Sequence, residues 1–240
     1  GRQRDESSPL AERAAALGLP VVPMEAAALT ELAGAGDAGV QGMVLEAGPL
    51  PVLTDVEGLL EARPADGGGR RIVALDGVED PRNLGAIARV AEAAGATGLL
   101  MTERRSPPLG PVASRASAGA LEWIPVCRVP NLVRALERLK EGGLWVVGAD
   151  PDAEQTLFAI PDRLLAGDLV VLLGAEGRGL RPSVRRAVDH PVRIPMRGRV
   201  ESLNVASAAA VLLFEMVRRD DARRAQGPAA AGDGARPPVG

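Results

Sequence analysis

Several residue types are nearly absent from this chain of 240 residues, and each shortage excludes a class of chemistry. Aromatic residues make up only 2% of the sequence and Tyr is missing, so the core must be built from aliphatic side chains. The single cysteine, Cys127, excludes an internal disulfide and most cysteine-based metal sites, and it favours a reducing compartment. The single histidine, His190, leaves one candidate base for Ser/His/Asp catalysis and no histidine-rich metal site. We therefore expect no bound metal.

Long apolar runs are also missing. No run reaches the roughly 18 residues that a membrane span needs, and no charged-then-apolar leader precedes a cleavage site. Hydrophobic residues nevertheless make up 46% of the chain and charged ones 25%, which is typical of a globular protein that buries a core. We expect a cytoplasmic protein without a membrane partner.

Charge is unevenly distributed, although the net charge is only −3. Residues 1–66 carry eleven acids and four arginines, whereas residues 178–199 carry seven arginines and one acid, Asp189. Such a basic cluster can attract phosphates even in a mildly acidic protein. It is also typical of a solvated surface in which Arg replaces Lys, because Lys140 is the only lysine. The cluster alone leaves both interpretations open.

Residues 1–62 are predicted to form short alternating elements. Ser8 is a candidate N-cap, Pro9 occupies the first helical position and Gly18 ends the helix. The further predicted elements are a strand at 19–24, a helix at 25–34 and a strand at 42–47.

A glycine-rich break follows these elements. Pro64 and the three glycines Gly67 to Gly69 predict a flexible linker at 63–70, and hence a domain boundary. At the other end of the chain, residues 221–240 are rich in Pro, Gly and Ala and are predicted to be disordered.

Between the linker and the tail, strands and helices alternate. The predicted strands lie at 71–76, 98–102, 124–129, 144–149, 168–174 and 190–196. The predicted helices lie at about 83–94, 131–141, 181–189 and 202–219. Runs such as "LVVLL" are apolar without alternation, as in strands that are covered on both faces. The pattern predicts an α/β domain with a mostly parallel sheet.

Polar residues follow the first of these strands. Because ligands of open parallel sheets bind beyond the carboxyl ends of the strands, such residues are candidates for a site. Asn83 can cap a helix there, and Arg89 lies six residues later. Gly85, four residues before Arg89, would let the arginine stem lie back toward Asn83. The alternative is an exposed Arg89 paired with Glu92, with Asn83 acting only as a cap.

A second candidate follows the most apolar strand. Glu176 lies among Gly174, Gly177 and Gly179. Glycines permit close approach of a ligand to the backbone, and a lone Glu can accept hydrogen bonds from ribose hydroxyls. The spacing is neither a dinucleotide fingerprint nor a P-loop. Taken alone, it favours a plain tight turn.

The third candidate is the stretch "IPMRGRVESLNVASAAAVLLFE", residues 194–215. Ser202 or Asn204 can cap the helix that follows. From Val205 to Phe214 this helix is apolar nearly all round, so it must be buried on more than one side, within the fold or in a subunit interface. Polar groups enclosed at its start would then need partners.

Together these stretches resemble the SpoU branch of the SPOUT RNA methyltransferases, which transfer a methyl group from S-adenosylmethionine to a ribose 2′-hydroxyl. The matching motifs are "DPRNLGAIARVAEAAG", "LLGAEGRGL" and "IPMRGRVESLNVASAAAVLLFE", in the family's order. The chain is most similar to the bacterial 23S rRNA guanosine 2′-O-methyltransferases. The resemblance implies a trefoil-knotted methyltransferase domain at 71–220 and a homodimer whose interface includes the last helix.

The resemblance also implies a role for residues 1–62. They are expected to be part of an RNA-binding domain similar to ribosomal protein L30e, with "LGLPVVPM…GVQGMVLEAGPLP" resembling its second half. The first half is not matched, and the chain begins at Gly1. Where relatives often have His-Gln-Gly, this chain has Val40, Gln41 and Gly42, which puts an RNA contact by that histidine in doubt.

Site residues are carried over position by position. The cofactor would rest on the backbone of Gly174, Ile194 and Leu203, with Met196 nearby. The polar active-site positions are Asn83, Arg89, Glu176, Ser202 and Asn204. The arginines expected to hold RNA phosphates are Arg178, Arg181, Arg197 and Arg199.

A ribose hydroxyl is a poor nucleophile at neutral pH, so catalysis needs positioning and a route for the proton. The hypothesis is that Arg89, assisted by Asn83 and Ser202, orients the hydroxyl and stabilises the developing alkoxide, because a guanidinium is almost always protonated. With so few aromatic residues, recognition should rest on phosphate, 2′-hydroxyl and shape. Alternatives are a tRNA or other rRNA target, or a catalytically idle RNA-binding assembly factor. A nucleotide-dependent oxidoreductase is a remote alternative, because the glycine-rich dinucleotide-binding fingerprint is missing.

Overall fold

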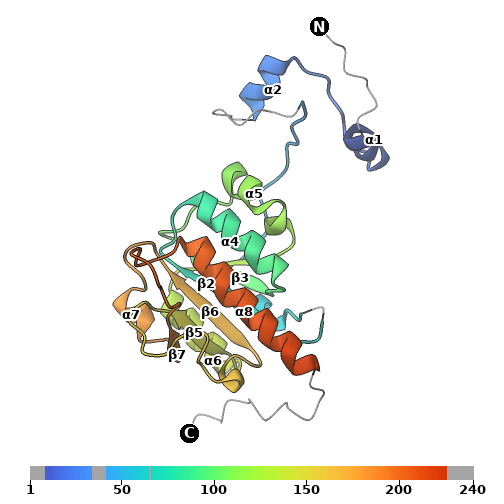
Figure 1. Cartoon of the computed structure of the whole chain (residues 1–240). Coiled ribbons are helices and arrows are strands. Elements are labelled where there is room, and N and C mark those ends of the chain that lie inside the picture. Colours follow the sequence, from blue (N-terminus) through green and yellow to red (C-terminus); the bar gives the residue numbers. More distant parts are fainter. Residues whose placement is uncertain (1–8, 34–41, 65, 226–240) are drawn as a thin grey trace. The chain divides into compact units, whose positions relative to one another are not determined.

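The computed structural model describes residues 9–33, 42–64 and 66–225, which fall into two compact units, residues 1–48 and 49–240 (Figure 1). The first unit contains the helices α1 (Pro9–Ala16) and α2 (Ala26–Leu32). Gly18 has a left-handed φ of 69°, as expected of the residue that ends α1. Neither helix contains a buried residue. The predicted cap Ser8 lies outside the described residues.

Neither strand predicted for this unit is formed. Residues 19–24 and 42–47 have no β-structure. A strand is stable only when a neighbouring strand satisfies its backbone N–H and C=O groups, and no described residue of this unit provides one. The prediction of these two strands was therefore wrong.

The second unit is built on a parallel sheet. Its strands are β1 (Val52–Leu53), β2 (Arg71–Asp76), β3 (Gly98–Thr102), β4 (Val126–Val129), β5 (Trp145–Ala149), β6 (Leu169–Gly174) and β7 (His190–Val192). Across the described residues their order is β1-β4-β3-β2-β6-β5-β7, and every pair is parallel. The predicted α/β class with a mostly parallel sheet is confirmed. β7 ends earlier than predicted, because after Val192 only Arg193 makes a further bridge, to Thr156.

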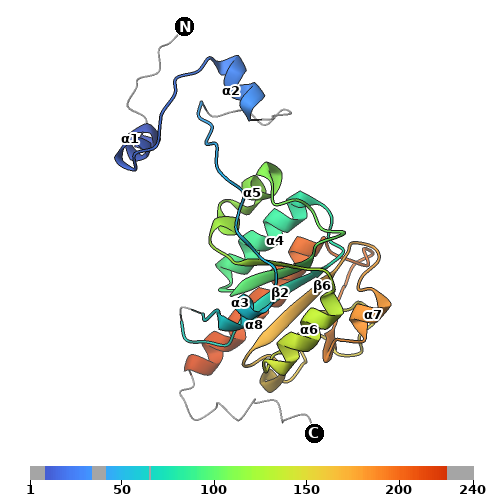
Figure 2. The same cartoon turned by 180° about the vertical axis from the view of Figure 1, so that it is seen from behind.

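Helices cover both faces of the sheet. They are α3 (Glu57–Glu61), α4 (Pro81–Ala93), α5 (Pro111–Ser117), α6 (Leu132–Glu141), α7 (Pro182–Arg185) and α8 (Val205–Ala225). α4, α5 and α8 pack on one face, and α3, α6 and α7 on the other, as Figures 1 and 2 show from opposite sides. The result is three layers, helix, sheet and helix.

The central strand β2 shows why the sheet is apolar without alternation. Val73 and Leu75 belong to the core under α4 and α8, whereas Ile72 and Ala74 belong to the core under α6. Successive side chains of a strand point to opposite faces, so a strand covered on both faces needs apolar residues at every position.

The segment before the predicted linker belongs to the sheet. Residues 1–62 were assigned to the first domain, but the division between compact units falls after Gly48. β1 pairs with β4, and Leu59 of α3 is fully buried against the sheet. This docking gives the backbone of β1 a parallel neighbour and buries the apolar side of α3.

The predicted linker itself packs on the domain. The backbone N–H of Arg70 donates to Asp168 Oδ1 over 2.6 Å, and the Arg70 side chain also binds Asp168. A Cβ on Gly69 would lie 2.0 Å from the carbonyl oxygen of Gly167. Gly69 thus allows close packing rather than flexibility.

α8 is longer than predicted and continues to Ala225, into the segment predicted to be disordered. Its last turns are held by ion pairs, because Arg223 binds Asp220 and Arg224 binds Asp66. The rest of the predicted tail, residues 226–240, lies outside the described residues. No helix that the structure describes is long and apolar enough to cross a membrane.

Candidate active site

Three polar side chains from distant parts of the sequence meet beyond the carboxyl ends of β2 and β6. Glu176 Oε1 accepts hydrogen bonds from Asn204 Nδ2 at 2.6 Å, from Asn83 Nδ2 at 3.2 Å and from the Val205 backbone N–H at 3.3 Å. Asn204 Nδ2 also donates to Asn83 Oδ1 at 3.0 Å. Glu176 Oε2 has no hydrogen-bond partner among the described residues. We call Asn83, Glu176 and Asn204 the polar triad.

Asn204 has two roles, one for each end of its amide. Its Oδ1 accepts a hydrogen bond from the Ala206 backbone N–H at 2.9 Å and so caps α8. This leaves the Nδ2 group directed to Glu176 and Asn83. α8 begins at Val205 rather than at the predicted position 202. Ser202 is exposed and makes no hydrogen bond with any described residue, so it is not the cap.

The predicted capping role of Asn83 was wrong. Asp80 is the N-cap of α4, because its carboxylate accepts a hydrogen bond from the Arg82 backbone N–H at 2.8 Å and Pro81 takes the first helical position. The Asp-Pro pair in the sequence is the signal that identifies this start. Freed from capping, Asn83 presents its amide from the first turn of α4 to Glu176.

The loop that carries Glu176 is a tight turn. Ala175 and Gly179 bridge each other, and both Gly177 and Gly179 have left-handed φ angles of 74° and 62°. A Cβ on Gly174 would lie 2.2 Å from the carbonyl carbon of Gly179, so only glycine allows the turn to close on the strand end. The predicted tight turn is therefore formed, and it also carries Glu176 of the polar triad.

An ion pair between the buried Asp76 and the partly exposed Arg181, which the sequence did not reveal, fastens this loop to the sheet. Asp76, at the end of β2, accepts hydrogen bonds from the Arg181 backbone N–H at 2.8 Å and from Arg181 Nε at 2.6 Å. The Asp76 side chain is fully buried. An acid that ends an otherwise apolar strand is the signal that could have found it. Arg181 was expected to hold RNA phosphate, but at least part of its guanidinium binds Asp76 and stabilises the fold.

The segment expected to hold the cofactor has free backbone groups. No backbone hydrogen bond joins any of residues 194–203 to another described residue. Met196 and Leu203 are each 37% exposed, and Ile194 packs against the core. Polar backbone and apolar surface side by side, next to the polar triad, fit a ligand that has both a polar and an apolar part. The residues present thus fit S-adenosylmethionine.

Arg89 takes no part in the triad contacts. It is exposed on α4 and makes no ion pair or hydrogen bond with any described residue, so the pair with Glu92, which was the alternative to a role in the site, is not formed. Gly85 does not leave a slot for its stem, because a Cβ there would lie 2.3 Å from the Ala113 carbonyl oxygen and 2.5 Å from the Ala116 Cβ. The missing side chain at Gly85 makes room for α5.

The remaining arginines expected to bind RNA are available. Arg178, Arg197 and Arg199 are exposed and form no ion pair with a described residue. Of the other members of the cluster, Arg185 is engaged, since it binds Asp150 and Asp152. The basic surface beyond β6 and β7 is therefore only partly neutralised.

His190 lies at the opposite end of its strand from the triad. It is the first residue of β7, and its ring packs against Trp145 with centroids 5.1 Å apart. Burial lowers the pKa of His190, which keeps it neutral near pH 7. No group of three or more His, Cys, Asp and Glu side chains that could hold a metal ion occurs in the part of the chain that the structure describes.

The fold and the site define an α/β protein whose polar triad lies beyond the carboxyl ends of a parallel sheet, where ligands of such sheets bind. The family is defined by sequence comparison. The model of the SpoU rRNA methylase family matches residues 70–214, so the chain belongs to this family. The resemblance inferred from the three motifs is confirmed.

Two relatives cover most of the chain. The 23S rRNA (guanosine-2′-O-)-methyltransferase RlmB of Pseudomonas putida is 44% identical over 186 residues, or 77% of this chain and 73% of that protein. RlmB of Pseudomonas aeruginosa is 40% identical over 222 residues, or 91% of this chain and 86% of that protein.

Solved structures of methyltransferases are also similar to this chain. An rRNA methyltransferase from Sinorhizobium meliloti, bound to S-adenosylmethionine, superposes with a TM-score of 0.68 at 28% identity, covering 89% of this chain and 77% of that one. The SpoU methyltransferase AviRb of Streptomyces viridochromogenes, in complex with the same cofactor, gives a TM-score of 0.62 at 28% identity, covering 71% of this chain and 66% of that one.

Proposed function

We propose that the protein transfers a methyl group from S-adenosylmethionine to the 2′-hydroxyl of a ribose in RNA, and that the target is a guanosine of 23S rRNA. The observation that carries the proposal is the polar triad beside a segment with unpaired backbone groups, in a member of the SpoU family. The guanosine and the rRNA come from the activity named for the similar RlmB proteins. Action on rRNA favours the cytoplasm, where bacterial ribosomes are assembled.

The segment 194–203 and Gly174 are proposed to hold the cofactor. Backbone N–H and C=O groups of Ile194 and Leu203 are available for its polar atoms, and the exposed side chains of Leu203 and Met196 for its apolar part. The cofactor supplies a methyl group on a positively charged sulfur, which is already a good electrophile. Catalysis by this chain then consists of orienting the hydroxyl and removing its proton.

The triad is proposed to orient the ribose. Glu176 Oε2 has no partner among the described residues and can accept a hydrogen bond from a ribose hydroxyl. Asn83 and Asn204 hold the other carboxylate oxygen, which fixes the direction of Oε2. Ser202, exposed and unbonded among the described residues two positions before Asn204, is proposed to contact the substrate.

Arg89 is proposed to hold the neighbouring phosphate and to stabilise the alkoxide that develops. An arginine that is exposed and unpaired within the described chain can bind an oxyanion with two parallel hydrogen bonds, without first breaking another contact. A guanidinium stays protonated in proteins, so electrostatic stabilisation is the role we propose for it rather than that of a base. The proton is expected to leave to phosphate or water.

The knot, the homodimer and the RNA-binding role of the first unit also belong to this proposal. The return of the chain from β7 to Asn204, beside the loop that carries Glu176, is compatible with a trefoil knot. α8 leaves Phe214 48% exposed although its first half, from Val205 to Phe214, is apolar nearly all round, and a second copy of the chain would cover it. Arg178, Arg197 and Arg199, with the free part of Arg181, would hold RNA phosphates.

The experiment compares 23S rRNA from cells with and without the gene, by mapping ribose methylation at every nucleotide. We expect one guanosine to lose its methyl group in the deletion strain and to regain it when the purified protein and S-adenosylmethionine are added. An rRNA that is methylated identically in both strains would refute the function.

The role of Arg89 is tested with Arg89→Lys, which keeps the charge but loses the two-pronged contact. We expect turnover on RNA to fall about 100-fold, the order found when one transition-state donor is removed, while cofactor affinity stays within about 2-fold. The matched control is Arg163→Lys, another exposed arginine without an ion pair to a described residue, at the opposite edge of the sheet. Near-normal turnover of Arg89→Lys would overturn the assignment.

A further inference from the structure

The sheet order places a second set of arginines beside the polar triad. The triad lies beyond β2 and β6, which are neighbours, and β3 is the neighbour of β2 on the other side. β3 ends at Thr102 and leads into the loop 103–110, which carries Arg104 and Arg105. Neighbouring strands lie about 4.8 Å apart. The loop is therefore next to the strand that leads to Asn83, on the side away from the cluster at 178–199.

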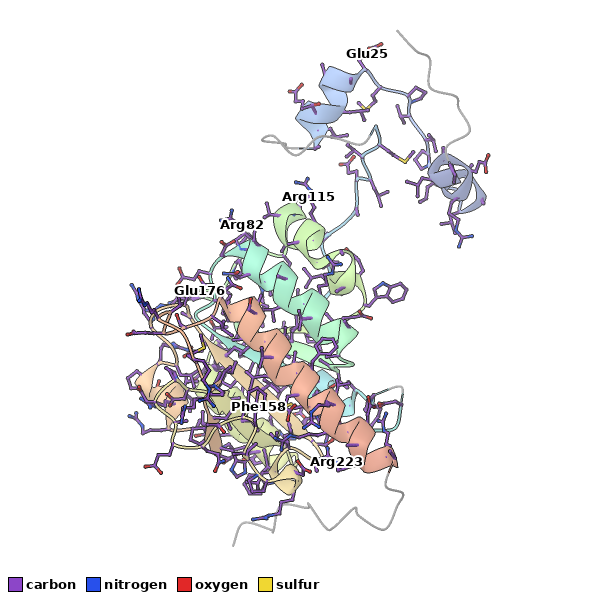
Figure 3. All side chains as sticks on the ribbon, in the orientation of Figure 1. Glu25, Arg82, Arg115, Phe158, Glu176 and Arg223 are labelled. Carbon is purple, nitrogen blue, oxygen red and sulfur yellow. The ribbon has the colours of Figure 1, made fainter. Side chains whose placement is uncertain are left out.

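Arg104 and Arg105 are available for an anionic ligand. Both are exposed, and neither forms an ion pair or side-chain hydrogen bond with a described residue. The only acid in the loop is Glu103. By contrast, Arg70 and Arg71 at the opposite edge of the sheet are neutralised, because Arg70 binds Asp168 and Arg71 binds Asp220. Figure 3 shows the two ends, with Arg82 and Glu176 at one and the paired Arg223 at the other.

The loop is held in a defined shape. Thr102 Oγ1 donates to the Arg104 carbonyl oxygen, and Arg128 Nη2 donates to the carbonyl oxygen of the buried Pro107. Arg105 has a φ of 59°, one of two non-glycine residues in the described chain with a left-handed backbone. This conformation is unfavourable for a residue with a Cβ, and it persists where surrounding contacts impose it. Glycine would avoid the cost, yet the position holds an arginine.

The phosphates of an RNA strand give a reason for arginines on both sides of the polar triad. A target nucleotide inside an RNA strand has phosphates before it and after it, and Arg and Lys side chains are common partners of such phosphates. The cluster at 178–199 follows β6 and β7, whereas the loop 103–110 follows β3, on the other side of β2. We infer that Arg104 and Arg105 bind the RNA phosphates on the other side of the target nucleotide, so that the strand crosses the sheet edge from β7 to β3. This inference rests on the proposed methyl transfer to RNA.

The test uses the full chain and a 23S rRNA fragment that contains the mapped methylation site. The variant Arg104→Ala/Arg105→Gly removes both charges, and glycine tolerates the left-handed backbone, so the fold is retained. We expect the slope of log Kd against log salt to fall by about 1 for each arginine, and Kd near 0.1 M salt to rise on the order of 10-fold. Affinity for S-adenosylmethionine should not change. Arg163→Ala is the control and should bind RNA as the wild type does.

Two RNA truncations make the test directional. Shortening the fragment on the side that contacts loop 103–110 should abolish the difference between variant and wild type, whereas shortening it on the other side should leave the difference intact. A double variant with the wild-type Kd and salt slope overturns the inference while the methyltransferase proposal stands. A wild-type protein that neither binds nor methylates the RNA refutes the proposed function, and this inference with it.

Discussion

Replacing Gly85 with alanine tests how the start of α4 is positioned. A Cβ at this position would lie 2.3 Å from the Ala113 carbonyl oxygen, 2.5 Å from the Ala116 Cβ and 2.9 Å from the Ser117 backbone nitrogen. Ordinary contacts begin at 3.4 Å, so α5 must retreat by about 1 Å. Two of the three obstacles are backbone atoms, which no side-chain rotation relieves.

The two opposing contributions can be estimated. Alanine in place of glycine within a helix stabilises the helix by about 1 kcal/mol. Overpacking a well-packed interface costs about 1–3 kcal/mol, and a clash with backbone lies at the upper end. The net loss for Gly85→Ala is therefore about 2 kcal/mol. In a protein of this size it lowers the midpoint of thermal unfolding by about 4–8 °C.

Thermal unfolding followed by circular dichroism measures this shift. Gly58→Ala is the matched control, because Gly58 also lies in a helix but faces the movable side chain of Leu53. We expect the control to unfold within about 2 °C of the wild type. If Gly85 instead existed to give room to the Arg89 stem, Gly85→Ala would keep its unfolding temperature and lose only turnover. That result would refute the packing argument.

Two further changes probe the site and the last helix. Glu176→Gln keeps an acceptor for Asn204 but removes the charge, so turnover should fall at least 10-fold while the unfolding free energy changes by about 1 kcal/mol or less; normal turnover would exclude a role for the carboxylate. Hydrogen bonds from Arg218, and from Arg219, lower the pKa of Glu215 to about 2. The ionised form therefore stabilises the fold above about pH 4.5, and this contribution is lost as the pH falls toward 2. Glu215→Gln should cost about 3 kcal/mol at neutral pH, because it breaks a buried pair. In urea titrations that difference should shrink below pH 4.5; a constant difference would contradict the assignment.

The central strands were predictable because burial on both faces leaves a continuous apolar run. β2 and β3 have the predicted bounds. The convergence of Asn83, Glu176 and Asn204 was also accessible, since the carboxyl ends of parallel strands share one edge. Local pattern sufficed for the strands, whereas the site also needed the family resemblance, because each of its stretches taken alone favoured a turn or a cap.

Other features depend on partners that lie far away in the sequence. The strand predicted at 19–24 has the right residue types but no neighbouring strand among the residues that the structure describes. Asp76 and Arg181 are 105 residues apart, and nothing local joins them. The space beside Gly85 was predicted to hold the stem of Arg89, but α5 fills it. A glycine in a sequence does not reveal which segment packs against it.

The spacing of the polar triad has a consequence for how the protein is made. The hydrogen bond between Asn83 and Asn204 joins residues 121 positions apart, and the one between Asn83 and Glu176 spans 93. At roughly 5–20 residues per second, a ribosome takes about 6–24 s to reach Asn204 after Asn83. During that interval the growing chain lacks a complete site. The proposed site, which includes segment 194–203, is therefore completed only after the chain has been translated as far as Asn204, so a ligand of the complete site cannot guide the earlier steps of folding.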